Sequence, residues 1–466
     1  MKKVHYTKAN IDSKTTIEKR ITDTKRLVIS AILVGFITLT SFSAKAQETW
    51  SLEKCIDYAL ANNMDLIISN NNTEKQKITV LESKARLLPT LTLGSRVDFS
   101  FGRNIDGNTN TITFDQTMTN NYGFSTSLDL FNGFIKLNTI GFNKYLLSAN
   151  KEEASYIKNK LIFDILTSYS IVLYSKGLQK VAQSQLTLSE SQYKRMQKLV
   201  DIGRESQITV QELKSLWAND KFNLTIADNN YNKALLQLKQ LLRLEVTQSF
   251  EIEDLGLNST FSTTQQNIDS LFKRAVNILP EIKQQEFLYK ASIKDLAISK
   301  GGLSPRIYMS AGIYTNYFDG DPIGFSKQIK NNQSQAVGMG ISIPIFNNAL
   351  VYSNIKRKRI IVKDRELLLQ KQKEVLYSEI WNAVDELQSA NNEYQSAEEL
   401  YGFSELTLKS ATKKMEKGLA SPTDYEVAKQ RFVSAKGSLL KTKIVYYMRM
   451  QMLQFYKTGN WNHINQ

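Results

Sequence analysis

The strongest constraint on the fold of this chain is an internal repeat whose period is nearly half the chain. Three separate motifs each occur twice: SKxxLxP at 83–89 and 299–305, LxLFN at 128–132 with IxIFN at 343–347, and GxxS at 203–206 and 418–421. In all three cases the second occurrence follows the first at nearly the same distance along the chain. A nearly constant spacing of this kind predicts two structural copies of one unit.

The repeat and its flanking composition divide the chain into four segments. We expect a signal peptide over 1–46, a first copy over 47–256, a polar linker over 257–266, and a second copy with a C-terminal tail over 267–466. The signal peptide is predicted because a basic pair at 25–26 precedes an apolar stretch over 27–43, which is followed by the small-x-small sequence Ala44-Lys45-Ala46. A membrane anchor is the alternative, although this stretch is short for a span and includes Ser and Thr.

Charge and rare residue types argue against several classes of function. The formal net charge is +15, but +6 of it lies in residues 1–46, so an exported chain gives little reason to expect a nucleic-acid partner. Cys55 is the only cysteine, and its apolar surroundings predict a buried thiol rather than a disulfide. The only histidines, His5 and His463, lie near the two ends of the chain. We therefore predict no enzyme, no metal site and no cofactor.

Each copy is expected to open with a helix that ends at a proline. Apolar residues recur at three-and-four spacing over 51–86 and again over 268–300. These helices should end before Pro89 and Pro305, because proline cannot continue a helix.

A much longer helix is expected later in each copy. Segments 135–201 and 350–416 keep the helical period almost without interruption, and at about 1.5 Å per residue each spans on the order of 100 Å. Turns follow at Gly203 and Gly418, where we expect left-handed backbone. A return helix should then run to about residue 244 in the first copy and residue 456 in the second.

Between the opening helix and the long helix, the apolar period changes to two, which predicts a pair of strands in each copy. The four strands are expected over 91–101, 122–130, 307–314 and 337–345, with exposed loops over 103–121 and 318–335. One face of each strand is apolar and the other is small or polar, and about ten residues can cross a bilayer as a tilted strand. A half-buried sheet in a soluble protein is the alternative.

Four strands cannot close a membrane barrel, and an open sheet edge is not tolerated in lipid. The smallest common membrane barrels have about eight strands. If the sheet spans a membrane, copies of the chain must associate so that the strand number is a multiple of four. A dimer, a trimer and a tetramer all satisfy this condition.

The order of elements, occurring twice, resembles the TolC-like outer membrane efflux proteins. The resemblance covers the whole exported part of the chain and includes the turns at Pro89 and Pro305, the tips at Gly203 and Gly418, and the opening sequence WSLxxCIxxALxNN at 50–63. It implies a mainly α fold with a membrane β-barrel portion, in which two repeats of helix, β-hairpin, long helix and return helix trimerise. The homotrimer would form a 12-stranded barrel in the outer membrane and an α-helical barrel in the periplasm.

The resemblance also implies a function and partners. We expect an outer-membrane exit duct that passively conducts small molecules and docks to a periplasmic adaptor and an inner-membrane efflux pump or ABC transporter. A duct for type I protein secretion is the alternative with the same fold. A periplasmic helical scaffold without a pore is a third hypothesis, from a different class of protein.

The tips of the two helical hairpins are the predicted docking sites for the adaptor. They comprise Gly203, Arg204, Glu205 and Ser206 in the first copy, and Gly418, Leu419, Ala420 and Ser421 in the second. A plain turn that needs glycine for its backbone is the simpler interpretation of the two glycines. An apolar tip at Leu419 and Ala420 favours a partner surface.

The resemblance further places Asp424 at the periplasmic aperture, with Thr209 at the matching position of the first copy. A simpler role for Asp424 is helix capping, because SPTD at 421–424 is typical of an N-cap, a proline and a capping acid. Strand alternation places Arg96, Asp98 and Asp129 on the inner face of the expected barrel, where they would shape the field of the lumen or only pair with one another.

Overall fold

The computed structural model describes residues 49–105, 110–114, 116–245, 247, 249–254 and 267–461. The predicted signal peptide and the predicted linker over 257–266 lie outside these ranges. The chain divides into two compact units. The smaller unit contains residues up to Trp50 together with 248–253, and the larger unit contains 51–247 and 254–466.

The smaller unit, as far as it is described, is a two-stranded parallel ladder. Strand β1 (Thr49–Trp50) pairs with β6 (Glu251–Ile252). The amide of Glu253 donates to the carbonyl of Trp50 at 3.0 Å, and the rings of Trp50 and Phe250 meet edge to face with centroids 5.3 Å apart.

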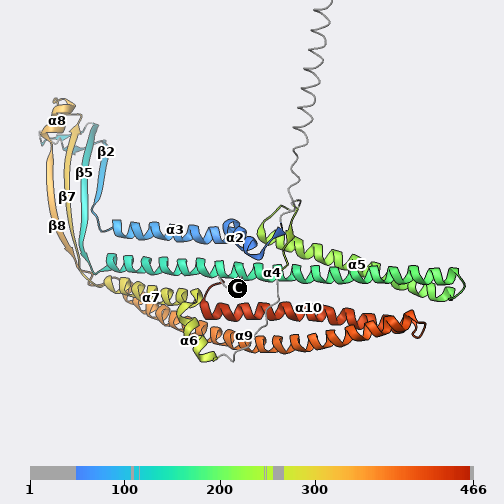
Figure 1. The fold of residues 1–466 in the computed structure, drawn as a ribbon. Coiled ribbons are helices and arrows are strands. Elements are labelled where there is room, and N and C mark those ends of the chain that lie inside the picture. Colours follow the sequence, from blue (N-terminus) through green and yellow to red (C-terminus); the bar gives the residue numbers. More distant parts are fainter. Residues whose placement is uncertain are drawn as a thin grey trace, which may run out of the picture. The chain divides into compact units, whose positions relative to one another are not determined.

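The larger unit contains a four-stranded antiparallel sheet built from both copies (Figure 1). Its order is β2 (Thr90–Ser100), β5 (Thr117–Asn132), β7 (Arg306–Phe318) and β8 (Ser334–Ser342). The four predicted strands are confirmed, with β5 starting earlier than expected. The predicted end of β8 at residue 345 was wrong, because Pro344 has no N–H to donate to a ladder.

The segments that connect the strands hold more structure than the predicted loops. A small ladder joins β3 (Asn104–Ile105) and β4 (Ile112–Thr113), and a short helix, α8 (Phe325–Asn331), precedes β8. The buried side chain of Gln328 in α8 accepts from the amide of Phe318 at 3.0 Å and donates to its carbonyl at 2.9 Å. This side chain therefore satisfies the edge of β7 beyond the point where β8 begins.

The two long helices have the predicted bounds. They are α4 (Ile135–Asp201) and α9 (Leu350–Glu416), each with 67 residues. Each begins after a residue with left-handed backbone, Phe134 with φ 61° and Ala349 with φ 59°. The return helices are α5 (Gln207–Leu242) and α10 (Pro422–Thr458).

The opening helix of each copy is broken, so the prediction of one continuous helix over 51–86 and over 268–300 was wrong. The first copy has α2 (Leu52–Asn62) and α3 (Met64–Ala85), and the second has α6 (Ile268–Ile278) and α7 (Pro280–Gly301). Asn63 ends α2 and caps α3, because its side chain accepts from the amide of Leu66 at 3.0 Å. Pro280 occupies the first turn of α7, where its missing N–H costs nothing.

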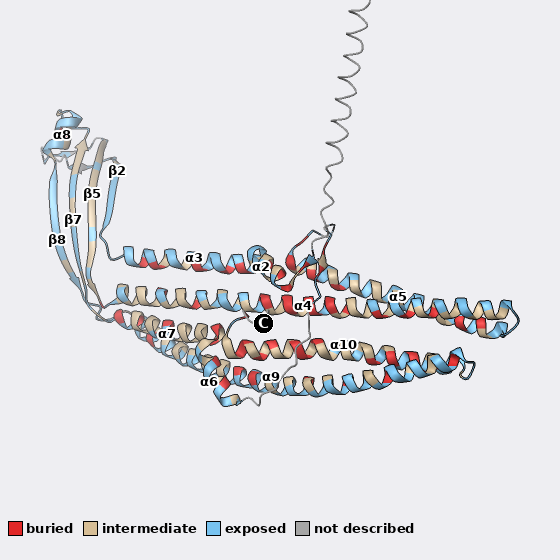
Figure 2. Cartoon of the chain, in the orientation of Figure 1, coloured by how far each residue is buried: buried red, intermediate tan, exposed pale blue. Residues whose placement is uncertain are grey.

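The helices next to the sheet follow the order of the strands. Helix α3 packs on α4, α4 on α7, and α7 on α9, which parallels the strand order β2, β5, β7, β8. Figure 2 shows the buried residues along the helices and none in the four strands of the sheet. Among the described helices, α4 alone is long and apolar enough to cross a membrane by composition, but its residues Ile165, Leu166 and Tyr169 are fully buried by packing.

Candidate functional site

The sheet has one apolar face and one polar face, as its alternation predicts. Leu93, Val337 and Met339 lie on the apolar face, and 79%, 80% and 67% of their surfaces are exposed. Exposed apolar patches of this extent are rare on soluble monomers and mark a surface that meets lipid or another protein. The polar face carries the charged residues that the sequence singled out.

Glycines on the polar face give room to tyrosine rings. A Cβ built on Gly123 would lie 3.0 Å from the ring of Tyr314, which sits opposite it in the ladder, and one on Gly340 would lie 2.4 Å from the ring of Tyr308. The two rings therefore lie against the backbone of the neighbouring strand instead of projecting from the sheet. The polar face is lined by tyrosine rings and small side chains.

Arg96 and Asp98 pair with one another. The Nε of Arg96 donates to Oδ1 of Asp98 at 2.7 Å, and the Nδ2 of Asn121 donates to the second carboxylate oxygen at 3.5 Å. The Arg96 side chain remains 80% exposed. The predicted pairing is thus confirmed for these two residues, and the guanidinium still presents most of its surface to the surroundings.

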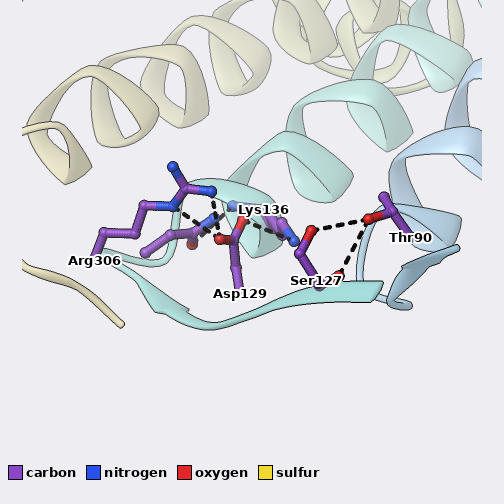
Figure 3. A network of polar contacts seen from close by, with 6 residues as sticks. Thr90, Ser127, Asp129, Lys136 and Arg306 are labelled. Atoms are coloured by element: carbon purple, nitrogen blue, oxygen red, sulfur yellow. Dashed lines mark hydrogen bonds and ion pairs between the residues drawn. The ribbon is translucent and has the colours of Figure 1, made fainter. Parts of the chain in front are cut away.

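Asp129 forms a separate network at the helix end of the same face (Figure 3). One carboxylate oxygen accepts a hydrogen bond from the Nε of Arg306 at 2.8 Å and forms an ion pair with its Nη2 at 2.7 Å, while the other meets the Nζ of Lys136 at 3.0 Å. Nearby, the hydroxyls of Thr90 and Ser127 hydrogen-bond at 2.9 Å. The prediction that Asp129 pairs with Arg96 or Asp98 was therefore wrong.

This network and the neighbouring hydroxyl pair together connect four elements where strands turn into helices. Asp129 is on β5, Arg306 begins β7, Lys136 is in the first turn of α4, and the hydroxyl pair links β2 to β5. Together with Glu82 and Arg86 of the adjoining segment, these residues line a cavity of about 570 Å³. Arg306 and Lys136 were not among the residues predicted from the sequence. Arg306 was detectable, because it is in phase with Tyr308 and Ser310 on the polar face.

Both helical hairpins end in the predicted left-handed glycine. Gly203 has φ 69° and Gly418 has φ 70°. In the second tip, the amide of Leu419 donates to the carbonyl of Lys414 at 2.8 Å and that of Gly418 to Met415 at 3.0 Å, the hydrogen-bond pair of a Schellman motif. The same pair joins Arg204 to Leu199 and Gly203 to Val200 in the first tip.

The tips expose apolar side chains, and they do so more extensively than predicted. Leu419 is 73% exposed, and in the first tip Ile202 and Ile208 are 64% and 72% exposed. Glu205 is exposed too, and the hydroxyl of Ser206 caps α5 by accepting from the amide of Ile208 at 3.2 Å. Three large apolar side chains in water at the ends of two hairpins favour a partner surface over a plain turn.

Asp424 caps α10, which confirms the simpler of its two predicted roles. Its carboxylate accepts from the amide of Ser421 at 3.1 Å and from the hydroxyl at 2.7 Å, and its own amide donates to that hydroxyl at 3.1 Å. These hydrogen bonds from Ser421 lower the pKa of the Asp424 carboxyl below its usual value. Thr209 lies half-buried in the first turn of α5.

A buried ion cluster that was not predicted from the sequence joins the return helices of the two copies. Lys429 of α10 is 1% exposed, and its Nζ donates to the two carboxylate oxygens of Asp220 on α5 at 2.8 and 3.1 Å. Glu426 approaches the same ammonium at 2.8 Å, without the angle of a hydrogen bond. Tyr425 is buried beside them, and burial raises the pKa of its hydroxyl.

Within the described residues, no group of three or more His, Cys, Asp or Glu side chains is arranged to hold a metal ion. Cys55 is fully buried, and burial raises the pKa of its thiol to about 12. The prediction of a buried thiol is confirmed.

Comparisons with known proteins find relatives in sequence and solved structures with a similar fold. No protein-family model matches the chain. The solvent efflux pump outer membrane protein SrpC of Pseudomonas putida is 23% identical over 319 residues, which cover 66% of this chain and 63% of SrpC. The match therefore spans less than two thirds of the length of SrpC. The pyoverdine export outer membrane protein OpmQ of Pseudomonas aeruginosa is 22% identical over 331 residues, which cover 70% of this chain and 67% of OpmQ.

Solved structures match over a larger part of the chain. The crystal structure of CusC, described as forming a transmembrane channel, superposes with a TM-score of 0.76 at 17% identity. The superposition covers 90% of this chain and 96% of the CusC chain. The predicted fold class, two repeats that combine long helices with a β-hairpin, is confirmed.

Proposed function

We propose that this chain, which has the fold of the TolC-like outer membrane efflux channels, is the outer-membrane exit duct of an efflux system. It would conduct small molecules passively from a periplasmic adaptor and an inner-membrane pump to the outside. Residues 1–46 would direct export, the sheet would lie in the outer membrane, and the helices would extend into the periplasm. The two copies over 47–256 and 267–466 would each supply a hairpin and a set of helices.

The observation that carries this proposal is the sheet. Its apolar face is exposed in the single chain, its opposite face is polar, and β2 and β8 each pair on one side only among the described strands. A sheet with these two faces fits lipid on the outside and water on the inside. Because open edges are not tolerated in lipid, copies of the chain would have to close the barrel.

Three copies would give twelve strands, and we infer this number from the likeness to channels of the same fold. The long helices would then form a tube continuous with the barrel. Exposed apolar tips around Gly203 and Gly418 would meet the adaptor, because they present side chains that water solvates poorly. Asp424 and Thr209 would lie at the periplasmic aperture, where a ring of Asp424 carboxylates would favour cations.

The polar face of the sheet would line the lumen. Arg96 and Asp98 would lie toward the outer mouth, and Asp129 with its two cations would lie where the barrel meets the helices. Arg96 and Asp98 neutralise one another, whereas Asp129 neutralises one of its two cations and leaves the cluster with one positive charge. A lumen of paired charges, tyrosines and glycines would bind no cargo tightly, which suits a conduit for varied solutes.

The names of the relatives favour small molecules as cargo. SrpC is named for solvent efflux and OpmQ for pyoverdine export. A duct for type I protein secretion shares the fold and is separated by the phenotype of a deletion strain. Loss of resistance to small toxic compounds supports efflux, whereas loss of a secreted protein from the medium supports the alternative.

Native mass and conductance test the proposal. Protein extracted from the outer-membrane fraction in mild detergent is expected to have the mass of three mature chains. In planar bilayers it should conduct ions, and Asp424→Ala, which removes both the cap and the proposed aperture charge, should raise conductance. A monomer from the soluble fraction, or an oligomer that stays silent with Asp424→Ala, would overturn the proposal in favour of a periplasmic scaffold.

A further inference from the structure

The two edges of the sheet carry an inference about how copies of this chain join. We propose that β8 of one chain pairs antiparallel with β2 of the neighbouring chain in one specific register, in which Gly338 lies opposite Asp98. The inference rests on the proposed function in one respect, namely that copies close a barrel. It adds the register of the joint and the residues that each copy contributes to it.

The internal repeat is kept in the strand pairing, residue by residue. In the first hairpin, Gly94 of β2 pairs with Gly123 of β5. By the spacing of the repeated motifs, position 94 is equivalent to position 310 and position 123 to position 338. This equivalence predicts that Ser310 of β7 pairs with Gly338 of β8. The second hairpin has this pair, and the rest of its ladder follows the same rule. The two copies are therefore equivalent at the level of single backbone pairs.

The joint between the copies within one chain then serves as a template for the joint between chains. Inside the chain, β5 of the first copy pairs with β7 of the second, and Gly123 lies opposite Tyr314. The equivalent strands between chains are β8 and the next β2. By the same spacing, Gly338 is the position equivalent to Gly123, and Asp98 is the position equivalent to Tyr314.

This register keeps the two faces of the sheet continuous across the joint. Gly338 and Asp98 both belong to the polar face. The adjacent pair, Met339 opposite Val97, brings together two residues of the apolar face that are 67% and 47% exposed in the single chain. A shift by one residue would place each apolar side chain on the polar face, so only shifts by two preserve the faces.

The space around the glycines is compatible with this register. The position of a Cβ on Gly123 is filled from across the ladder by the ring of Tyr314 at 3.0 Å. The same position on Gly338 is open, with the hydroxyl of Ser310 as its nearest neighbour at 3.6 Å. In the proposed register, Asp98 of the next copy occupies the place that Tyr314 takes inside the chain.

The Arg96–Asp98 pair thus belongs to a site that one chain leaves incomplete. The Arg96 side chain is 80% exposed in the single chain. In the proposed register, Arg96 lies opposite Gly340 of the neighbouring chain, two residues along the ladder from the pair of Asp98 with Gly338. Each joint between chains brings the ion pair of one chain against two glycines of the other. The Arg96–Asp98 pair would therefore mark the boundary between chains, whereas the Asp129 cluster lies inside one chain.

Cysteine cross-linking in the full chain tests the register. Cys55→Ala removes the only natural thiol, and Gly338→Cys is kept constant, because its Cβ has room. It is combined in turn with Arg96→Cys, Asp98→Cys or Ser100→Cys, which all lie on the same face of β2. Opposite residues in a ladder lie within disulfide range, whereas partners two residues away lie at or beyond it.

A second series fixes Met339→Cys and varies the partner among Ser95→Cys, Val97→Cys and Phe99→Cys. Adjacent pairs in an antiparallel ladder alternate between close and wide spacing, so one of the two series samples the closer geometry. Cross-links within one chain are excluded, because β2 and β8 are separated by two strands of about 4.8 Å spacing. Covalent oligomers on non-reducing gels are therefore links between copies.

The expected result is covalent oligomer with Asp98→Cys in the first series or Val97→Cys in the second, and its loss with the shifted partners. Cross-linking that is strongest at Arg96→Cys or Ser100→Cys overturns the register. If the protein conducts ions and no pair cross-links, the inference fails while the proposed function stands. A monomer that neither conducts nor cross-links overturns both.

Discussion

At the scale of single residues, the side chains that sequence reasoning missed are those that join distant parts of the chain. Lys429 lies in a stripe with Tyr425, Ala428 and Phe432, all buried on α10. Helical periodicity predicts that this stripe is buried, but it gives no reason for a buried lysine within it. Only the packing of α5 against α10 shows that Asp220, far away in the sequence, neutralises it.

The buried cluster gives a first prediction. Asp220→Asn leaves the ammonium of Lys429 with one flanking carboxylate, and the loss of a buried partner is expected to destabilise the protein by about 3 kcal/mol or more. Adding Lys429→Met should recover most of this loss, because a buried ion pair can be replaced by apolar side chains of similar size. Thermal unfolding followed by circular dichroism in detergent measures both effects.

Its control is an exposed ion pair. Arg195 and Glu416 also join the two copies at 3.0 Å, but their side chains are 58% and 43% exposed. Glu416→Gln should change stability by less than about 1 kcal/mol. Equal effects of Asp220→Asn and Glu416→Gln would show that burial does not strengthen the first pair.

A second residue-scale prediction concerns pH. Burial raises the pKa of Glu281, and the neighbouring Glu379 raises it further. A carboxyl whose pKa is raised by folding binds its proton more tightly in the folded state. Its stabilising effect is therefore full below the unfolded pKa of about 4.3 and is lost as pH rises through the folded value.

Glu281→Gln mimics the protonated form and removes this loss. The variant should melt at a higher temperature than the natural chain at pH 7, and the difference should vanish as the pH falls toward about 4. Glu366→Gln, which removes an exposed charge on α9, provides the control and should leave the melting temperature unchanged. A natural chain that melts higher than Glu281→Gln at pH 7 would refute the assigned direction.

At the scale of elements, the sequence predicts the long helices better than the short ones. The bounds of α4 and α9 follow directly from the strand ends before them and the glycine turns after them. The breaks at Asn63 and Pro280 were missed because the apolar period continues across both. An N-cap side chain and a proline in a first turn are local signals, and a search for periodicity alone does not detect them.

The glycine turns give a prediction with a matched control. Gly418 has φ 70° and nothing within 4 Å of a built Cβ, so Gly418→Ala should destabilise by about 1 kcal/mol through backbone strain alone. Gly402 lies inside α9 with equally open space, and Gly402→Ala should stabilise by about 1 kcal/mol through helix propensity. Opposite shifts in melting temperature are expected from the same chemical change.

Substitution by asparagine tests whether the left-handed backbone causes the destabilisation at Gly418. It tolerates left-handed backbone better than alanine, so Gly418→Asn should destabilise less than Gly418→Ala. If both substitutions at 418 leave stability unchanged, the backbone at the tip relaxes freely and the left-handed turn is not required.

At the scale of the whole molecule, the repeat was the most informative feature of the sequence. It predicted two copies, four strands and the need for partners, since one face of the sheet is apolar and its edges are open. Beyond the local pair of Arg96 with Asp98, the sequence did not predict which charged groups meet. Asp129 lies 177 residues before Arg306, and no local pattern connects them. Contacts between copies depend on the sheet register, which periodicity leaves undetermined.

The equal length of α4 and α9 has an evolutionary consequence. Both helices have 67 residues and begin at equivalent points beside one sheet, so their tips depend on the same count of residues. An insertion in one copy alone would displace one tip from the other by about 1.5 Å for each added residue. Lineages that change the length of these helices are therefore expected to carry paired insertions or deletions, one in each half of the gene.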